Sequence, residues 1–197
     1  MENGHSYKTV HHRFMVWSRH RVFEDAFRNL ARQYVEESRR LPLIADTTFV
    51  KNVFGKEVLG RNHTDRGRRA IKVSLLSDAA GVPLATAYHM PNTHDCKTLR
   101  HLLDTARRTL AAPLSRHQRI YADKGYDSQT CRSACGVHGL EACIPHRGSC
   151  DGWGSTRYVV EVVFGRLDRF RRIILRYDAT MHAFRSFHSL ACCALIR

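Results

Sequence analysis

The sequence predicts an α/β fold, in which a mixed sheet of about five strands carries helices on both faces and follows a short helical segment. Two observations predict the sheet. Three segments rich in apolar and β-branched residues follow one another early in the chain, at residues 43–50, 71–76 and 82–89. After residue 92, helical and strand patterns alternate, which is typical of parallel crossover units. A third observation is the length of 197 residues, which suffices for one substantial core.

The N-terminal part is expected to be helical. Between residues 9 and 39, apolar side chains such as Phe14 and Phe27 recur at helical intervals, with Arg and Glu between them. This pattern predicts one or two amphipathic helices. We assign residues 1–40 to a helical N-terminal segment and residues 41–197 to the main domain.

Each helix and strand of the main domain is predicted from a local sequence pattern. The first strand leads into residues 51–69, where three glycines stand among lysines and arginines, and this stretch is expected to be a basic loop or hairpin. A leucine stripe over residues 92–110 predicts a helix, capped by Asn92 or Thr93. The remaining patterns predict, in order, a strand at residues 119–122, a helix at 128–138, a strand at 140–144, a glycine-rich loop at 146–155, and helices at 158–176 and 181–195.

The charge indicates a polyanionic partner. The chain has 32 Lys and Arg residues against 18 Asp and Glu, a net charge of +14. Such an excess favours nucleic acid, although charge alone also fits a protein that is merely basic. The sequence has no apolar run long enough for a transmembrane helix and no signal-peptide core, so we expect a cytoplasmic, nucleoid-associated protein. The seven cysteines predict no disulfide framework, because their number is odd and no secretory signal is present.

An acidic residue stands at the edge of each of three apolar segments. Asp46 lies within the first strand, and Asp123 directly follows the strand at residues 119–122. On a helical wheel of residues 158–176, Glu161 borders the arc that faces the core. Carboxylates beside buried positions are costly unless their charge is compensated, and they suit Mg²⁺ or Mn²⁺. Taken singly, each acid is also explained as a cap or a solvated residue.

Several segments of the chain resemble a known family. They look like those of DDE transposases of bacterial insertion sequences, in particular the insertion-sequence-five group. The similarity covers roughly residues 7–196 and is strongest at residues 45–51, 60–68, 81–84, 92–95, 122–128 and 160–172.

The resemblance implies a ribonuclease-H-like catalytic domain over residues 41–197. It implies that Asp46, Asp123 and Glu161 are the catalytic residues and hold two Mg²⁺ or Mn²⁺ ions. The implied activity is metal-dependent phosphodiester cleavage at transposon ends and strand transfer into target DNA. The implied partner is double-stranded DNA, at terminal inverted repeats and at the target, with a homodimer as the active complex.

Further residues are assigned around these acids. The family's Tyr-x2-Arg-x3-Glu-x6-Lys signature maps only in part, because Gly154 stands at the tyrosine position and Asp168 at the lysine position. Basic residues that would track a DNA backbone, or would otherwise simply be exposed, are Lys51, Arg61, Arg66, Arg68, Arg157 and Arg169. Supporting roles are assigned to Asn92, Asp95 and Lys124, where Asn92 and Asp95 are alternatively helix caps.

The sequence is also compatible with two other functions. Family members of this kind usually carry a further helical region before the segment that matches Tyr7 to Phe23, so the resemblance implies a shortened chain. Such a chain is alternatively a catalytically impaired DNA-binding remnant or a repressor of transposition. A general nuclease of the same fold is a third reading.

Overall fold

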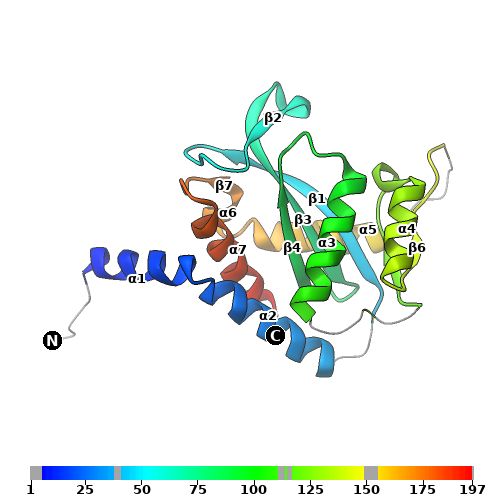
Figure 1. Ribbon diagram of the computed structural model, residues 1–197, viewed down its shortest axis with the longest axis horizontal. Helices are drawn as coiled ribbons and strands as arrows, with labels where there is room; N and C mark the ends of the chain where they lie inside the picture. Colours follow the sequence, from blue (N-terminus) through cyan, green and yellow to red (C-terminus); the bar gives the residue numbers. More distant parts are fainter. Residues whose placement is uncertain (1–5, 38–40, 111–113, 115–116, 149–154, 197) are drawn as a thin grey trace.

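The computed structural model describes residues 6–37, 41–110, 114, 117–148 and 155–196 (Figure 1). Within these residues, no helix is long and apolar enough to cross a membrane. The helices are α1 (Tyr7–Arg19), α2 (Val22–Glu37), α3 (Asp95–Leu110), α4 (Gln129–Val137), α5 (Ser155–Leu167), α6 (Arg171–Ile174) and α7 (Met181–Leu195), with 3₁₀ turns η1 (His63–Asp65) and η2 (Lys124–Tyr126). The strands are β1 (Leu43–Asn52), β2 (Gly60–Asn62), β3 (Arg68–Asp78), β4 (Pro83–His89), β5 (Arg119–Tyr121), β6 (Glu141–Cys143) and β7 (Leu175–Arg176).

The sheet is mixed, as predicted. Its five main strands lie in the order β4-β3-β1-β5-β6. Strand β3 is antiparallel to both β1 and β4, whereas β1, β5 and β6 are parallel. This confirms the predicted α/β fold class and is the ribonuclease-H-like arrangement that the resemblance implies. The short strand β2 pairs with the start of β3 within the basic stretch, in agreement with the hairpin expected there. The short strand β7, which pairs with the end of β1, was not predicted.

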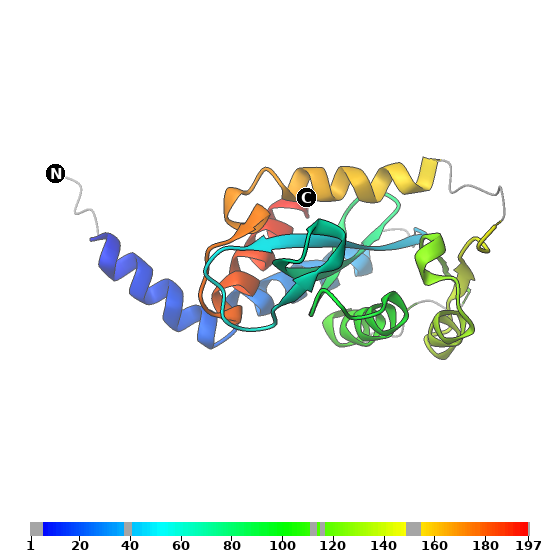
Figure 2. The same cartoon turned by 90° about the horizontal axis from the view of Figure 1, so that it is seen from above.

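Helices cover both faces of the sheet. Figure 2 shows α5 on one side of the sheet and α3 and α4 on the other. The leucine stripe of α3 is buried against β3 and β4, which explains why this helix forms where the pattern predicts it. On the opposite side, α7 packs its Phe184 ring 5.9 Å from the ring of Tyr88 on β4.

The N-terminal residues form two helices, as predicted. Phe27 and Ala31 of α2 belong to the core, and α2 packs against α7 and α3. Helix α1 projects away from the body and touches it near its C-terminal half, where the Phe14 ring lies 4.4 Å from that of Phe187 (Figure 1). The division of the chain at residue 40 into two units stays a prediction.

The prediction of one continuous helix over residues 158–176 is wrong. Helix α5 ends at Leu167, and the chain then forms the short helix α6 and the strand β7. The reason is tertiary: Lys51 and Asn52 of β1 pair with residues 175 and 176, and the buried Arg176 side chain donates to backbone carbonyls. The helical wheel therefore holds for Glu161 but not for residues after Leu167.

The cap of α3 also differs from the prediction. The helix begins at Asp95, and its cap is His94 rather than Asn92 or Thr93. The His94 ring accepts from the Cys96 N–H at 3.3 Å, and the His94 carbonyl accepts from the N–H groups of Lys97 and Thr98. Histidine is not one of the residues usually found at a helix N-cap, so the sequence did not predict a cap at this position.

Candidate active site

Two of the predicted acids lie on, or just beyond, neighbouring parallel strands: Asp46 is on β1, and Asp123 follows β5. In the register of β1 and β5, Leu43 pairs with Ile120 and Ile44 with Tyr121. If this register is continued by two residues, Asp46 comes level with Asp123, which lies just beyond the end of β5. Neighbouring strands are about 4.8 Å apart, so the topology brings these two positions together from distant parts of the sequence.

Asp46 lies on the face of β1 that α5 covers. Successive strand residues point to opposite faces, and Thr47, the next residue, hydrogen-bonds Tyr126 beneath α3. Asp46 is half-buried, and one carboxylate oxygen accepts from the Thr47 N–H at 2.7 Å. Helix α5, which carries Glu161, packs on β1. The helix and the strand thus place Asp46 and Glu161 on the same side of the sheet.

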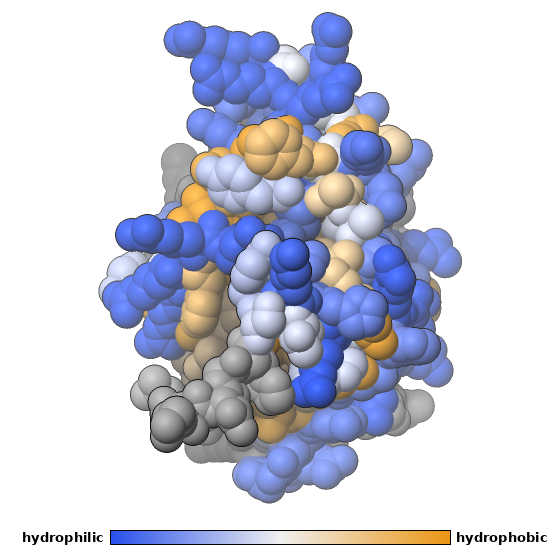
Figure 3. Space-filling model, turned by 90° about the vertical axis from the view of Figure 1, so that its left-hand side faces the viewer, coloured by the Kyte–Doolittle hydropathy of each residue, from blue (hydrophilic) through white to orange (hydrophobic). Residues whose placement is uncertain are grey.

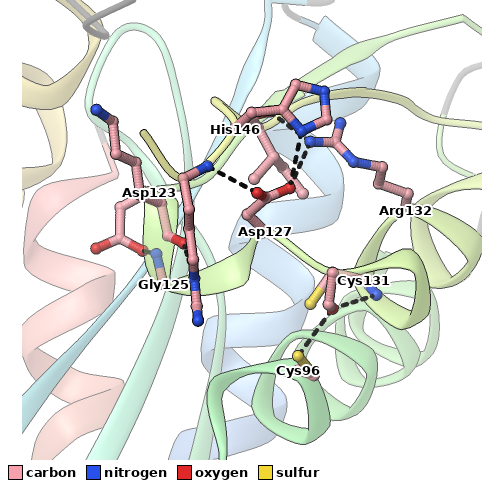
Figure 4. Close-up of polar contacts among 11 residues, drawn as sticks. Cys96, Asp123, Gly125, Asp127, Cys131, Arg132 and His146 are labelled. Atoms are coloured by element: carbon pink, nitrogen blue, oxygen red, sulfur yellow. Dashed lines mark hydrogen bonds and ion pairs between the residues drawn. The ribbon is translucent and has the colours of Figure 1, made fainter. Parts of the chain in front are cut away.

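Asp123 caps the turn η2 and is exposed. Its Oδ1 accepts from the Gly125 N–H at 2.8 Å, which holds the carboxylate over the turn (Figure 4). A Cβ atom at Gly125 would come within 2.8 Å of this oxygen and within 3.3 Å of Asp95 Oδ2. The carboxylates of Asp123 and Asp95 therefore border the same small space, and a glycine keeps that space open.

Asp95 is held by a lysine that sequence reasoning missed. Lys72, on β3, is 5% exposed, and its ammonium forms an ion pair with Asp95 Oδ1. The same ammonium donates to the carbonyl of Thr93 at 3.1 Å and lies 5.5 Å from the centre of the Phe49 ring. A lysine in the middle of an otherwise apolar strand was the available signal, because such a charge needs a buried partner.

Tyr126 also joins the site from within the core. Its hydroxyl interacts with Thr47 on β1 and Thr98 on α3, and so ties η2 to both elements. Burial raises the pKa of Tyr126 well above its usual value, and the negative charges of Asp46 and Asp95 raise it further. The hydroxyl therefore stays protonated and serves as a fixed hydrogen-bonding group.

Asp127 anchors the turn that carries Asp123. Its carboxylate accepts from the backbone N–H of Arg147 at 2.8 Å and from Arg132 Nη2 at 2.9 Å, with the His146 ring 3.3 Å away (Figure 4). The Arg147 N–H and the Arg132 side chain lower the pKa of Asp127, so it stays ionised. These contacts of Asp127 link η2 and α4 to the segment after β6.

The donor chemistry fits a divalent cation, but the three predicted acids are not gathered as ligands. Carboxylate oxygens are what Mg²⁺ and Mn²⁺ prefer. Glu161 is exposed along α5, and in the described parts of the chain no group of three His, Cys, Asp or Glu side chains is placed to hold a metal ion. The metal-binding triad thus stays a prediction, with Asp46 and Asp123 as the pair that the sheet brings together.

Four of the predicted DNA-contacting residues cluster around β2. Lys51, Arg61, Arg66 and Arg68 are all exposed, on β1, on β2, and on the β2–β3 connection and the start of β3. Figure 3 shows hydrophilic side chains over the top of this face, where β2 lies. Asp65 lies 3.8 Å from Lys51 Nζ and 4.0 Å from Arg68 Nη1, and such exposed pairs contribute little stability.

The other assigned residues lie apart from this cluster. Arg169 is exposed just after α5, Asn92 is exposed in the turn before α3, and Lys124 is exposed in η2. Arg157 belongs to α5, but its side chain lies outside the described part of the chain, as does Gly154. The DNA-contacting and supporting roles of these residues stay predictions.

Comparison with known proteins identifies the family. The family model described as "Transposase DDE domain" matches residues 37–153. A Burkholderia cepacia protein assigned as the transposase for insertion sequence element IS402 is 35% identical over 147 residues, which is 72% of this chain and 70% of that protein.

Solved structures with a similar fold include two catalytic domains. That of Mos1 mariner transposase has a TM-score of 0.41 at 11% identity, covering 87% of this chain and 90% of that chain. The catalytic core domain of BIV integrase has a TM-score of 0.46 at 10% identity, covering 80% and 84%. A chain of the simian T-cell lymphotropic virus intasome has a TM-score of 0.48 at 13% identity, covering 79% of this chain and 49% of that one.

The family model matches more than half of the chain, and the B. cepacia protein is 35% identical to it. The chain therefore belongs to the DDE transposases of insertion sequences.

Proposed function

We propose that the chain catalyses metal-dependent cleavage of phosphodiester bonds at transposon ends and joins the 3′-hydroxyls to target DNA. The proposal rests on the register of β1 and β5 in a chain of this family. Continued by two residues past the end of β5, this register would bring Asp123 level with Asp46. These two acids are the first two members of the predicted triad.

Asp46, Asp123 and Glu161 would hold one or two Mg²⁺ or Mn²⁺ ions. When bound, such ions make an attacking water or 3′-hydroxyl more nucleophilic and stabilise the leaving oxygen of a phosphodiester. The chain's own residues prepare the site: the Gly125 N–H orients Asp123, and Lys72 fixes Asp95 beside it. The exposed cations around β2 and the net charge of +14 favour contact with the DNA backbone. Cutting two ends in one complex requires two active sites, so we expect a homodimer on DNA.

The function is tested by incubating the full chain with DNA that carries the ends of its own element. We expect strand cleavage in the presence of Mg²⁺ or Mn²⁺ and none with a chelator. Binding of the same DNA, measured over a salt series, should weaken steeply as salt rises, because binding releases counterions.

A DNA-binding remnant or repressor of transposition is the second candidate. It is favoured by one observation, which is that the described acids do not form a three-ligand group. Salt-sensitive DNA binding without metal-dependent cleavage in the assay above would support this candidate and contradict the first.

The space at Gly125 leads to a prediction about the site. Gly125→Ala should lower the cleavage rate by about tenfold or more, because the new Cβ would lie 2.8 Å from Asp123 Oδ1 and must displace that carboxylate. The matched control is Gly136→Ala on α4, where a Cβ meets nothing within 4 Å. The control should keep full activity and gain about 0.5–1 kcal/mol of stability, as Gly→Ala does within a helix. Equal cleavage rates for the two variants would contradict the role assigned to Asp123.

A further inference from the structure

A cavity opens at the edge of the sheet that is remote from Asp123. Its volume is about 380 Å³, and residues of α2, α3, β4 and α7 line it. Strand β4 is at one end of the strand order and β5, which leads to Asp123, lies beyond β3 and β1. The cavity shares no lining residue with the candidate active site.

Arginines from four separate segments line this cavity. Arg21 lies between α1 and α2, Arg28 on α2, Arg108 on α3 and Arg185 on α7. Among the described residues that line the cavity, Glu24 is the only one with a carboxylate. Four guanidinium groups thus face a single acid, and their mutual repulsion costs energy unless an anion lies between them.

Two of these arginines, Arg185 and Arg108, form no ion pair within 4.0 Å of a carboxylate in the described part of the chain. Arg185 stacks on the ring of Tyr88, with its Cζ atom 5.3 Å from the ring centre, and its buried Nε has no hydrogen-bond partner within the described chain. Among the described residues, Arg108 Nη2 donates to the hydroxyl of Thr105, at 3.1 Å. Arg28 does pair with Asp25, at 2.9 Å, but Asp25 does not line the cavity.

The local electrostatics and backbone agree with a site for an anion. Burial raises the pKa of Glu24, although Arg185, Arg21 and Arg28 act to lower it. Burial and the charge of Arg108 lower the pKa of His101, which also lines the cavity. Arg21 has a φ of 58°, in the left-handed region that a residue with a side chain rarely adopts, and strained residues of this kind cluster at ligand sites.

We propose that this cavity binds a phosphate group. Guanidinium groups match phosphate in charge and in their two-pronged geometry, and the hydroxyl of Ser189 adds a neutral donor. The volume is near the lower end of the range for small-molecule sites, so it suits a single phosphate or a diphosphate rather than a duplex. The phosphate comes either from a strand terminus of DNA or from a free anion. The proposal does not depend on the proposed cleavage.

The test is titration calorimetry of the full chain with inorganic phosphate and with pyrophosphate, at constant ionic strength. We expect saturable binding. Arg185→Gln and Arg108→Gln should each weaken it by about tenfold or more, because each removes a charge-assisted hydrogen bond. Glu24→Gln should tighten it several-fold, since it removes the one opposing carboxylate. A residue that served only to stabilise the fold would not increase affinity when neutralised.

The matched control is Arg107→Gln, which is exposed in the same turn of α3 but does not line the cavity. It should bind phosphate as the unmodified chain does, and so should Asp123→Asn. If Arg185→Gln fails to fold, Arg108→Gln carries the test, because Arg108 is exposed at the end of its helix. The proposal is overturned if the unmodified chain shows no saturable binding, or if Arg107→Gln weakens binding as much as Arg108→Gln.

Competition then distinguishes the source of the phosphate. Displacement of bound phosphate by a 5′-phosphorylated oligonucleotide, but not by its 5′-hydroxyl form, would identify a DNA terminus. Displacement by pyrophosphate but by neither oligonucleotide would identify a free anion. Equal displacement by both oligonucleotides would overturn the proposal. It would show that the cavity binds the phosphates of the DNA backbone in general and has no preference for a terminal phosphate.

Discussion

Replacing Asp123 with asparagine is expected to lower metal-dependent DNA cleavage by at least about a hundredfold, which corresponds to about 3 kcal/mol of transition-state stabilisation. The side-chain oxygen of asparagine can still accept from the Gly125 N–H, so the turn η2 should keep its shape. What is lost is the negative charge opposite Asp46. DNA binding should therefore stay within about twofold of that of the unmodified chain. Cleavage of labelled transposon ends and a filter-binding titration measure the two quantities separately.

Two further variants sharpen this experiment. Asp46→Asn should reduce cleavage to a similar extent, because the register of β1 and β5, continued by two residues, brings Asp46 level with Asp123. Asp65→Asn is the control, because Asp65 is an acid whose ion pairs are with Lys51 and Arg68 near β2. It should leave cleavage nearly unchanged. Equal loss in all three variants, or no loss with Asp123→Asn, would remove the proposed catalytic role of Asp123.

Arg176→Ala is expected to lower the free energy of unfolding by about 3–5 kcal/mol. Arg176 is fully buried, and its guanidinium donates to the carbonyl of Glu57 at 2.5 Å and to that of Asp178 at 3.2 Å. Truncation would leave a cavity and would remove the donor from the carbonyls of Glu57 and Asp178. It would also release Glu57, whose carboxylate accepts from the Met181 N–H at 2.8 Å and so caps α7.

Urea denaturation followed by circular dichroism measures this effect. Arg171→Ala is the matched control, because Arg171 is an exposed arginine on α6, five residues away. Its replacement should change the free energy of unfolding by no more than about 0.5 kcal/mol. Arg176→Lys should recover only part of the loss, since an ammonium cannot reach both carbonyls with the geometry of a guanidinium. Equal stability of the Arg176→Ala and Arg171→Ala variants would contradict the structural role of Arg176.

The candidate site was predictable only where local pattern determines it. Asp46 and Asp123 stand out in the sequence because each interrupts or ends an apolar strand. Lys72 gave a weaker signal, and its partner Asp95 lies on another element, so their ion pair follows only from the packing of α3 on β3. Asp127 and its partners Arg132 and Arg147 likewise meet only after η2, α4 and the segment past β6 have folded together.

By itself, the sequence determined the five main strands, most helices and the mixed α/β class, because hydrophobic periodicity and turn residues act over a few neighbouring positions. The tertiary structure alone decided where α5 stops, since pairing of β7 with β1 and burial of Arg176 outweigh the helical pattern of residues 168–176. It also decided that four arginines from distant segments meet in one cavity. Contacts of this kind join residues far apart in the chain, and no local pattern encodes which of them will meet.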